Sequence, residues 1–255
     1  MKDERIIVIT GASGGLAEEL IKRLPQKDQL ILLGRSKEKL EELYVRREKK
    51  VCYQIDITND KAVHSIVDKI YEEYGGVDIL INNAGFGEFK DFNQYTDDMI
   101  RSMFDVNTLA TIQFSRLIGQ RMAKDQAGHI INIASIAGLI ATSKSTIYSA
   151  TKFAVIGFSN ALRLELADRH VYVTTVNPGP IATKFFNQAD PSGEYLKSVE
   201  EFTMQPGDVA RRILRILGKN KRELNMPFTL KAAYKAYVLF PKLSDFLARK
   251  VFNYK

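Results

Sequence analysis

The sequence predicts a single α/β domain built on a doubly wound parallel sheet, with a short helical extension at its C-terminus. A chain of 255 residues is long enough to bury one sizeable core. Short apolar runs alternate with longer helical patterns through most of the chain, which is typical of βαβ units whose sheet is covered on both faces. No internal repeat or low-complexity linker interrupts this alternation, so we expect one domain over residues 1–226 and the extension over 227–255.

Short apolar runs provide the candidate strands. They cover residues 6–10, 30–33, 51–55, 79–82, 129–134 and 171–177, and a seventh strand is expected to end at Met226. The longest helical patterns between them cover residues 97–123 and 148–167. Because crossovers between parallel strands are right-handed almost without exception, the doubly wound sheet is the simplest topology.

The net charge of +7 is concentrated at the C-terminus. Residues 231–255 hold six of the 37 basic residues and one of the 30 acidic residues, so this segment carries +5 and the rest of the chain only +2. A nucleic-acid surface needs Lys and Arg clustered on a folded face together with aromatic residues, and no such stretch precedes residue 231. We therefore expect no nucleic-acid partner.

Two further features bear on the compartment. No apolar run approaches the roughly 18 residues that a membrane-spanning helix needs, and the apolar run near the N-terminus is too short for a secretory signal. We therefore expect a cytoplasmic protein that does not span a membrane. The single cysteine, Cys52, lies in a strand-like run without nearby metal ligands, which predicts a buried, inert thiol and no metal site.

A glycine-rich turn directly follows the first predicted strand. It reads Thr-Gly-Ala-Ser-Gly-Gly-Leu-Ala over residues 10–17 and opens a helix that runs to about Leu24. The absent side chains let a ligand approach the backbone, and the N–H groups and dipole at the helix N-terminus favour a pyrophosphate. An ordinary strand-to-helix turn has the same pattern, so this motif alone does not decide between the two.

The end of the second strand bears on which dinucleotide would bind. The acidic residue that commonly binds the adenosine ribose is absent there, and Gly34 and Arg35 stand in its place. An arginine suits the 2′-phosphate of NADP(H) through charge-assisted hydrogen bonds, although a solvated arginine opening the next helix is the plainer alternative. Asp56, after the third strand, is placed to hold the adenine amino group.

Tyr148 and Lys152 are four residues apart in a predicted helix, so their side chains project from one face. A neighbouring ammonium lowers the pKa of a tyrosine from about 10 toward the pH at which general acid–base catalysis is most effective. Ser135 follows the fifth strand, at the sheet edge where ligands of open α/β folds bind. In isolation, a Tyr-Lys pair at this spacing is more often a surface feature.

Together these motifs resemble the short-chain dehydrogenases/reductases. The glycine turn, Asn82-Asn83-Ala84-Gly85, Ser135, Tyr148-x-x-x-Lys152 and Asn177-Pro178-Gly179 occur in the family's order and approximate spacing. The resemblance covers about residues 5–225 and implies a Rossmann-like fold and an NADP(H)-dependent oxidoreductase that interconverts a carbonyl and an alcohol. One departure is Ala17, where the family usually has glycine, and its methyl group should change only the packing of the helix.

The resemblance also implies roles for the matching residues. Tyr148 gives its proton to the carbonyl oxygen as hydride arrives from the nicotinamide, Ser135 hydrogen-bonds that oxygen, and Lys152 holds the nicotinamide ribose. Asn107 matches an asparagine that anchors a water chain leading to the lysine; a helix asparagine with local hydrogen bonds is the plainer interpretation. The implied cofactor site comprises Gly11, Ser13, Gly14, Gly15, Leu16, Arg35, Asp56, Ile57, Asn83, Ala84, Gly85, Tyr148, Lys152, Pro178, Gly179, Ile181 and Thr183.

In this family the segment after the sixth strand, here about residues 182–205, covers the substrate. It is rich in large apolar residues, namely Phe185, Phe186, Tyr195, Leu196, Phe202 and Met204. This composition indicates a lipophilic ketone or aldehyde, although a lid that buries the same residues against the body would look alike.

The C-terminal extension replaces the family's common glycine-rich ending. Apolar residues at helical spacing before and after Pro241 predict two amphipathic helices, with Ala233, Tyr234, Tyr237, Val238, Leu243, Phe246, Leu247 and Val251 on the apolar side and Arg249 and Lys250 among the polar positions. We expect this stripe to pack on its own domain or in the interface of a homodimer or homotetramer. A peripheral contact with an anionic membrane is the alternative.

Three functions are compatible with the sequence. An NADPH-dependent carbonyl reductase acting on a small-molecule substrate is the leading hypothesis. A 3-oxoacyl carrier-protein reductase is less compatible with the missing glycine-rich ending. A protein that senses NADP(H) without turnover would have no chemical need for the full set of Asn107, Ser135, Tyr148 and Lys152.

Overall fold

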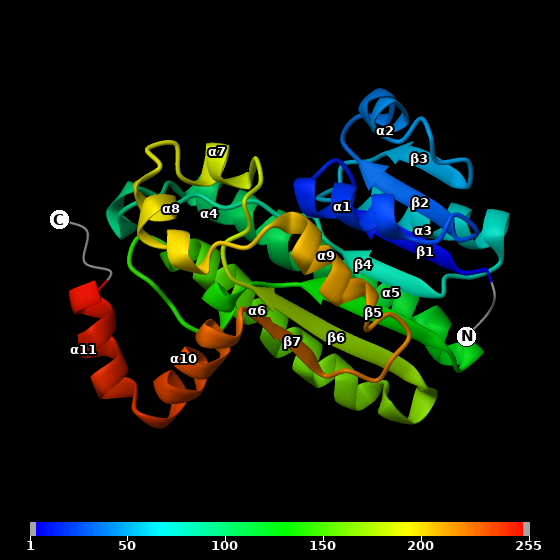
Figure 1. Ribbon diagram of the computed structural model, residues 1–255. Coiled ribbons are helices and arrows are strands. Elements are labelled where there is room, and N and C mark those ends of the chain that lie inside the picture. Colours follow the sequence, from blue (N-terminus) through cyan, green and yellow to red (C-terminus); the bar gives the residue numbers. More distant parts are fainter. Residues whose placement is uncertain (1–3, 252–255) are drawn as a thin grey trace.

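The computed structural model describes residues 4–251, apart from the side chains of Ser198 and of residues 247–251. Its strands form one parallel sheet in the order β3-β2-β1-β4-β5-β6-β7, with helices on both faces (Figure 1). The predicted doubly wound, Rossmann-like architecture is therefore confirmed. The strands are β1 (Ile6–Thr10), β2 (Gln29–Gly34), β3 (Lys50–Gln54), β4 (Ile79–Asn82), β5 (Gly128–Ile133), β6 (Val171–Pro178) and β7 (Glu223–Met226).

Helices cover the sheet in two layers. One layer comprises α1 (Gly15–Arg23), α2 (Lys37–Leu43) and α9 (Pro206–Leu214), and the other comprises α3 (Asp60–Tyr74), α5 (Ala110–Asp125) and α6 (Thr146–Glu165). The short helices α4 (Asp97–Phe104), α7 (Phe185–Ala189) and α8 (Glu194–Ser198) lie beyond the carboxyl ends of the strands (Figure 1). After β7 come only α10 (Phe228–Leu239) and α11 (Pro241–Val251) within the described residues.

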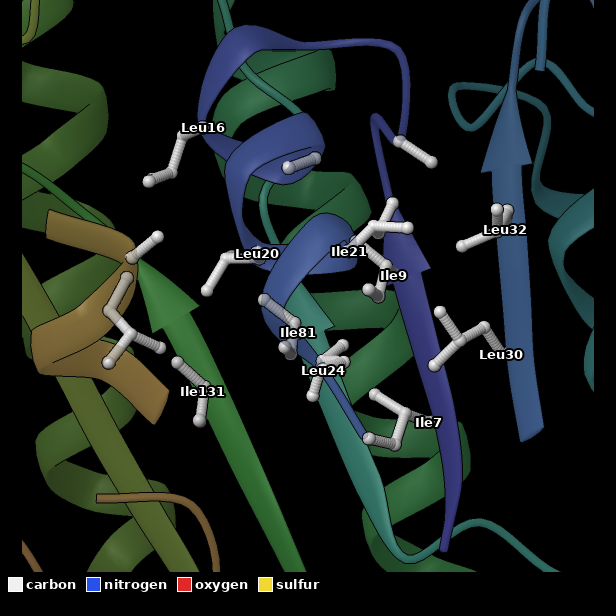
Figure 2. Close-up of a cluster of buried hydrophobic side chains, with 14 of the residues drawn as sticks. Ile7, Ile9, Leu16, Leu20, Ile21, Leu24, Leu30, Leu32, Ile81 and Ile131 are labelled. Carbon is white, nitrogen blue, oxygen red and sulfur yellow. The ribbon is translucent and has the colours of Figure 1, made fainter. Parts of the chain in front are cut away.

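The buried strands alternate their side chains between the two layers. In β1, Ile7 and Ile9 face α1, whereas Val8 faces α3 and α5. Figure 2 shows Leu20 of α1, and Leu24 directly after this helix, packed over β1 and its neighbours. Burying one such side chain contributes about 1.5–3 kcal/mol, so this contact holds the N-terminus of α1 at the carboxyl end of β1.

The segment predicted as one helix over residues 97–123 is interrupted. Between α4 and α5, residues Asp105–Leu109 form a π turn, which contains Asn107. The Asn107 side chain is fully buried and bonds to the backbone of Phe86 rather than to its own helix. Hydrophobic periodicity does not reveal such a local widening, because one inserted residue shifts the pattern by less than a turn.

Two other expectations from the sequence concern the single cysteine and membrane-spanning helices. Cys52 is buried in β3 as predicted, and burial raises the pKa of its thiol to about 11. No helix within residues 4–251 is both long and apolar enough to cross a bilayer.

His129 connects β5 to the loop before β7 and should make the fold sensitive to acid. Its Nδ1 accepts the N–H of Gly218 at 2.9 Å, so its proton sits on Nε2, which lies 2.8 Å from the hydroxyl of Thr174. Burial lowers the pKa of His129 from 6.5 to about 4. Since the unfolded chain takes up a proton at a higher pH than the folded chain, stability is lost as the pH falls from about 6.5 to 4.

We expect the free energy of unfolding at about pH 5 to be about 2 kcal/mol smaller than at about pH 7.5, as measured by urea denaturation. His129→Gln should remove this part of the pH dependence. His64→Gln, at an exposed histidine of α3, should keep it. A His129→Gln protein with the full wild-type pH dependence would contradict the assignment.

Candidate functional site

A cleft of about 1110 Å³ opens at the carboxyl ends of the strands. It begins where the strand order reverses between β1 and β4, which is where open α/β sheets bind ligands. Every residue predicted for the cofactor site, from Gly11 to Thr183, lines this cleft, as does Ser135. Asn107 is the exception, because it lies buried behind the cleft wall.

The glycine turn is held in place by the loop after β4. Gly11 has a φ of +61°, and a Cβ there would lie 2.7 Å from the Cα of Ala84. The hydroxyl of Thr10 accepts the backbone N–H groups of Asn83 and Ala84 at 3.0 and 3.1 Å. Asn83 Nδ2 donates to the carbonyls of Thr10 and Gly11, so this side chain positions the turn in addition to lining the cleft.

The N-terminus of α1 suits an anion. Its N-cap residue, Gly14, provides no side chain to accept the first N–H groups of the helix. These groups have no partner within a helix, and they carry the positive end of its dipole. A Cβ on Gly15 would lie 3.0 Å from the side chain of Thr183, so the cleft narrows at this point. The turn and helix together fit a pyrophosphate.

The end of the cleft beside β2 carries two cations. Arg35 is exposed directly after β2, and Ser36 caps α2 by accepting the N–H of Lys39 at 3.2 Å. This cap places Lys39 one turn into α2, where it also lines the cleft. Lys39 was not predicted for the site, because it lies one turn into α2 and not next to the strand. Across the cleft, Asp56 accepts two hydrogen bonds from Thr58, which lower the pKa of its carboxyl group.

Tyr148, Lys152 and Ser135 meet at the centre of the cleft. Tyr148 lies in the first turn of α6, and Lys152 Nζ is 5.7 Å from the centre of its ring. Lys152 Nζ donates to the carbonyl of Ile133 at 3.0 Å, and the hydroxyls of Ser135 and Tyr148 are hydrogen-bonded. The structure thus brings Ser135, which follows β5, together with the Tyr148-Lys152 pair of α6.

The pKa of Tyr148 differs from the expectation. Burial raises it above the ordinary value for tyrosine; the hydrogen bond from Ser135 offsets part of this increase and the nearby Tyr195 adds to it. The prediction of a lowered pKa is wrong for the protein alone, because burial raises the pKa of Tyr148 and the effect that opposes this increase comes from Ser135 rather than from Lys152. Burial also lowers the pKa of Lys152, to about 8. At neutral pH the Tyr148 hydroxyl therefore keeps its proton and is suited to donate it.

Asn107 supports this centre from behind. Its Oδ1 accepts the N–H of Phe86 at 2.9 Å, and its Nδ2 donates to the carbonyl of Phe86 and the hydroxyl of Thr151. A Cβ on Gly85 would lie 3.1 Å from Asn107 Oδ1 and 3.4 Å from Lys152 Nζ. These contacts join distant segments, so the local interpretation of this asparagine is wrong and its side chain positions the Gly85–Phe86 backbone against Lys152.

Aromatic rings surround Tyr148 on the other side of the cleft. Phe89 lies 5.5 Å from the Tyr148 ring and 4.4 Å from Tyr195 of α8, and Phe185 of α7 lies 5.8 Å from Tyr148. The N–H of Phe89 donates to the carbonyl of Ala189, which ties the loop after β4 to α7. Phe89 was missed from the sequence, because it lies in a loop without a periodic pattern.

The predicted covering segment divides into two groups. Phe185, Phe186, Tyr195 and Leu196 line the cleft. Phe202 and Met204 do not line it, and Met204 packs against the core between the sheet and α1. The segment is therefore a wall of the cleft over α7 and α8 and part of the core near residue 204.

Comparisons with known proteins agree with this geometry. A family model described as short chain dehydrogenase matches residues 5–193. An uncharacterized oxidoreductase of Staphylococcus aureus strain USA300 is 33% identical over 221 residues, which covers 86% of this chain and 93% of that protein.

Two solved structures extend the comparison. The closed form of a serine dehydrogenase complexed with NADP+ has a TM-score of 0.80 and 29% identity, over 88% of this chain and 95% of that one. ElxO with NADP bound has a TM-score of 0.77 and 27% identity, over 87% and 96%. With this match in sequence and fold, the chain belongs to the short-chain dehydrogenases/reductases, oxidoreductases that act on CH–OH groups with nicotinamide cofactors.

Proposed function

We propose that the protein is an NADPH-dependent carbonyl reductase, and in reverse an alcohol dehydrogenase, for a lipophilic ketone or aldehyde. The observation that carries this proposal is the arrangement of Tyr148, Ser135 and Lys152 at the centre of the cleft, where the centre of the buried Tyr148 ring lies 5.7 Å from Lys152 Nζ. The glycine turn and Arg35 line the same cleft. The NADP-bound serine dehydrogenase and ElxO support this choice of cofactor.

The cleft residues fit NADP(H) along its length. The turn from Gly11 to Gly15 would hold the pyrophosphate, and Arg35 with Lys39 would hold the 2′-phosphate. Asp56 and Ile57 would contact the adenine, and residues 178–183 the carboxamide. When bound, the cofactor supplies the hydride for reduction or accepts it in oxidation.

The chain's own residues would supply the proton and hold the oxygen of the substrate. In reduction, Tyr148 donates its hydroxyl proton to the carbonyl oxygen as the carbon gains hydride, which yields the alcohol. Ser135 Oγ accepts the N–H of Ala137, and the proton that it donates to Tyr148 in the protein alone would turn to the substrate oxygen. Lys152 would hold the nicotinamide ribose, and its ammonium stabilises the Tyr148 phenolate that remains.

The substrate class follows from the walls around Tyr148. Phe89, Phe185, Phe186 and Tyr195 present rings there, and such walls favour an apolar group next to the carbonyl. This property argues against a small polar substrate such as serine. The 3-oxoacyl carrier-protein reductase stays a secondary hypothesis, because the chain lacks the glycine-rich ending.

The assembly belongs to the same proposal. Exposed apolar residues lie on the outer faces of the π turn and α6, namely Leu109, Phe153 and Leu164. They support a homodimer or homotetramer, whose mass light scattering would measure. The cytoplasmic location remains a prediction.

The cofactor assignment predicts that Arg35→Ala weakens NADPH binding about tenfold to a hundredfold, because it removes a charged hydrogen bond to phosphate worth about 1.5–3 kcal/mol. NADH binding should change little. Fluorescence titration of both cofactors measures the difference. Lys37→Ala is the matched control, since Lys37 is exposed nearby and does not line the cleft. Wild-type protein that binds NADH as tightly as NADPH would contradict the assignment.

Gly34→Asp tests the same site by repulsion. A Cβ there would lie 3.1 Å from the flexible side chain of Leu40, so the residue can be accommodated with a small shift. Its carboxylate should repel the 2′-phosphate and lower the affinity for NADPH more than that for NADH. Equal loss for both cofactors would indicate a general disturbance of the turn.

A panel of carbonyl compounds with NADPH and NADH tests the reaction itself. We expect turnover with lipophilic ketones or aldehydes and NADPH. Preference for a 3-oxoacyl thioester would support the carrier-protein hypothesis, and oxidation of serine would contradict the apolar pocket. Tight NADPH binding without turnover of any compound would favour the sensing protein.

A further inference from the structure

The C-terminal extension carries an apolar surface that its own domain does not cover. Within residues 4–251, α10 has no buried residue. The large apolar residues exposed on α10, on α11 and at the residue between them are Phe228 (77%), Val238 (59%), Leu239 (70%), Phe240 (60%), Leu243 (56%) and Phe246 (54%). The expectation that the stripe packs on its own domain is therefore wrong for Val238 and Leu243, whereas Tyr234 and Tyr237 are partly buried. The side chains of Leu247 and Val251 lie outside the described residues, and packing between copies stays a prediction.

The extension is attached to the domain near its beginning. Leu230 lies against the loop after β6, since a Cβ on Gly179 would be 2.9 Å from Leu230 Cδ1. From there α10 and α11 project away from the sheet, as Figure 1 shows in orange and red. The exposed residues near Pro241, at the junction of the two helices, are therefore the part of the extension that is free to contact another molecule or a membrane.

The positive charge of the C-terminal extension indicates which kind of partner its apolar surface contacts. Residues 231–255 carry +5 of the net +7, and Lys231, Lys235 and Lys242 are exposed beside the apolar residues. Pairing with the extension of a second copy would bring +5 against +5. The rest of the chain, at +2, offers no excess of negative charge. An anionic bilayer offers both negative charge at its surface and an apolar layer beneath it.

We propose that residues 228–251 bind the surface of an anionic phospholipid bilayer, with the apolar residues around Pro241 inserted and the lysines at the headgroups. Because Leu230 contacts Gly179 in the cleft wall, binding would hold the cleft close to the membrane. A lipophilic carbonyl could then enter from the lipid; this last consequence rests on the proposed function, whereas membrane binding does not.

Co-sedimentation of the full-length protein with vesicles tests the proposal. We expect sedimentation with phosphatidylcholine vesicles containing about one-third phosphatidylglycerol, little with phosphatidylcholine alone, and release at about 0.5 M NaCl. Lys231→Glu/Lys235→Glu/Lys242→Glu should weaken binding about a hundredfold or more, given about 1 kcal/mol for each surface charge. The matched control, Lys61→Glu/Lys124→Glu/Lys219→Glu, makes the same charge change at exposed positions of the domain and should retain most of the binding.

A second variant isolates the apolar contribution. Val238→Ser/Leu239→Ser/Leu243→Ser keeps the charge and should also lose binding to anionic vesicles. Failure of the wild-type protein to sediment, equal binding to neutral vesicles, or equal losses in the two lysine variants would overturn the proposal. If the serine variant instead changed the mass measured by light scattering while the wild type ignored vesicles, the stripe would be an interface between copies. None of these readouts depends on turnover, so they leave the proposed reaction untouched.

Discussion

Replacement of Tyr148 with phenylalanine should lower turnover by about a hundredfold to ten-thousandfold and leave NADPH binding nearly unchanged. The substitution removes the proton that the carbonyl oxygen would receive and keeps the ring that packs against Phe89 and Phe185. The rate constant for NADPH oxidation with the best substrate of the carbonyl panel measures the first effect. Titration of NADPH measures the second.

Tyr71→Phe is the matched control for this experiment. The Tyr71 hydroxyl is also buried, but it lies in α3, outside the cleft, and has no hydrogen-bond partner among the described residues. Its removal should leave turnover at the wild-type level. A loss of less than about tenfold in Tyr148→Phe would exclude Tyr148 as the proton donor.

Replacement of Lys152 with methionine should abolish most of the activity while making the protein no less stable. In the proposed reaction the ammonium would hold the nicotinamide ribose and stabilise the phenolate, so both turnover and NADPH affinity should fall. Its burial lowers the pKa of Lys152 to about 8, which means that the folded protein pays for carrying the charge at neutral pH. An apolar side chain of similar length relieves that cost, just as the replacement of a buried ion pair by apolar residues is often neutral or stabilising by about 1–4 kcal/mol.

The pH dependence of the stability of the wild-type protein provides a second test of this prediction. Because the unfolded chain holds the Lys152 proton to a higher pH than the folded chain, this group's contribution to stability increases as the pH rises from about 8 toward its ordinary 10.5. Thermal unfolding of wild type and Lys152→Met at several pH values would show the gap between them closing over this range. Lys124→Met, at an exposed lysine of α5, should shift neither activity nor stability. A Lys152→Met protein with wild-type NADPH affinity would leave the lysine only its effect on Tyr148.

Much of the fold was predictable because it depends on local patterns. Strands buried on both faces need uninterrupted apolar runs, so β1 and β4 are visible in the sequence with the same bounds as in the structure. The glycine turn is equally visible, since glycine favours the positive φ of Gly11 and a Cβ at this position would collide with the backbone of Ala84. The predicted boundaries of β2 and β6 differ from those in the structure by one residue, a difference that hydrophobic periodicity does not resolve.

What the sequence by itself determined is the order of the strands along the chain, the family, and the motif residues of the cleft, because apolar runs mark the strands and short motifs at the strand ends mark the family and its site. Only the tertiary structure decided the rest. Phe89 and Lys39 enter the site through contacts between distant segments, and the pKa of Tyr148 is set by burial rather than by its sequence neighbour Lys152. The exposure of α10 was likewise invisible, since an amphipathic pattern records an apolar face and not the surface that covers it.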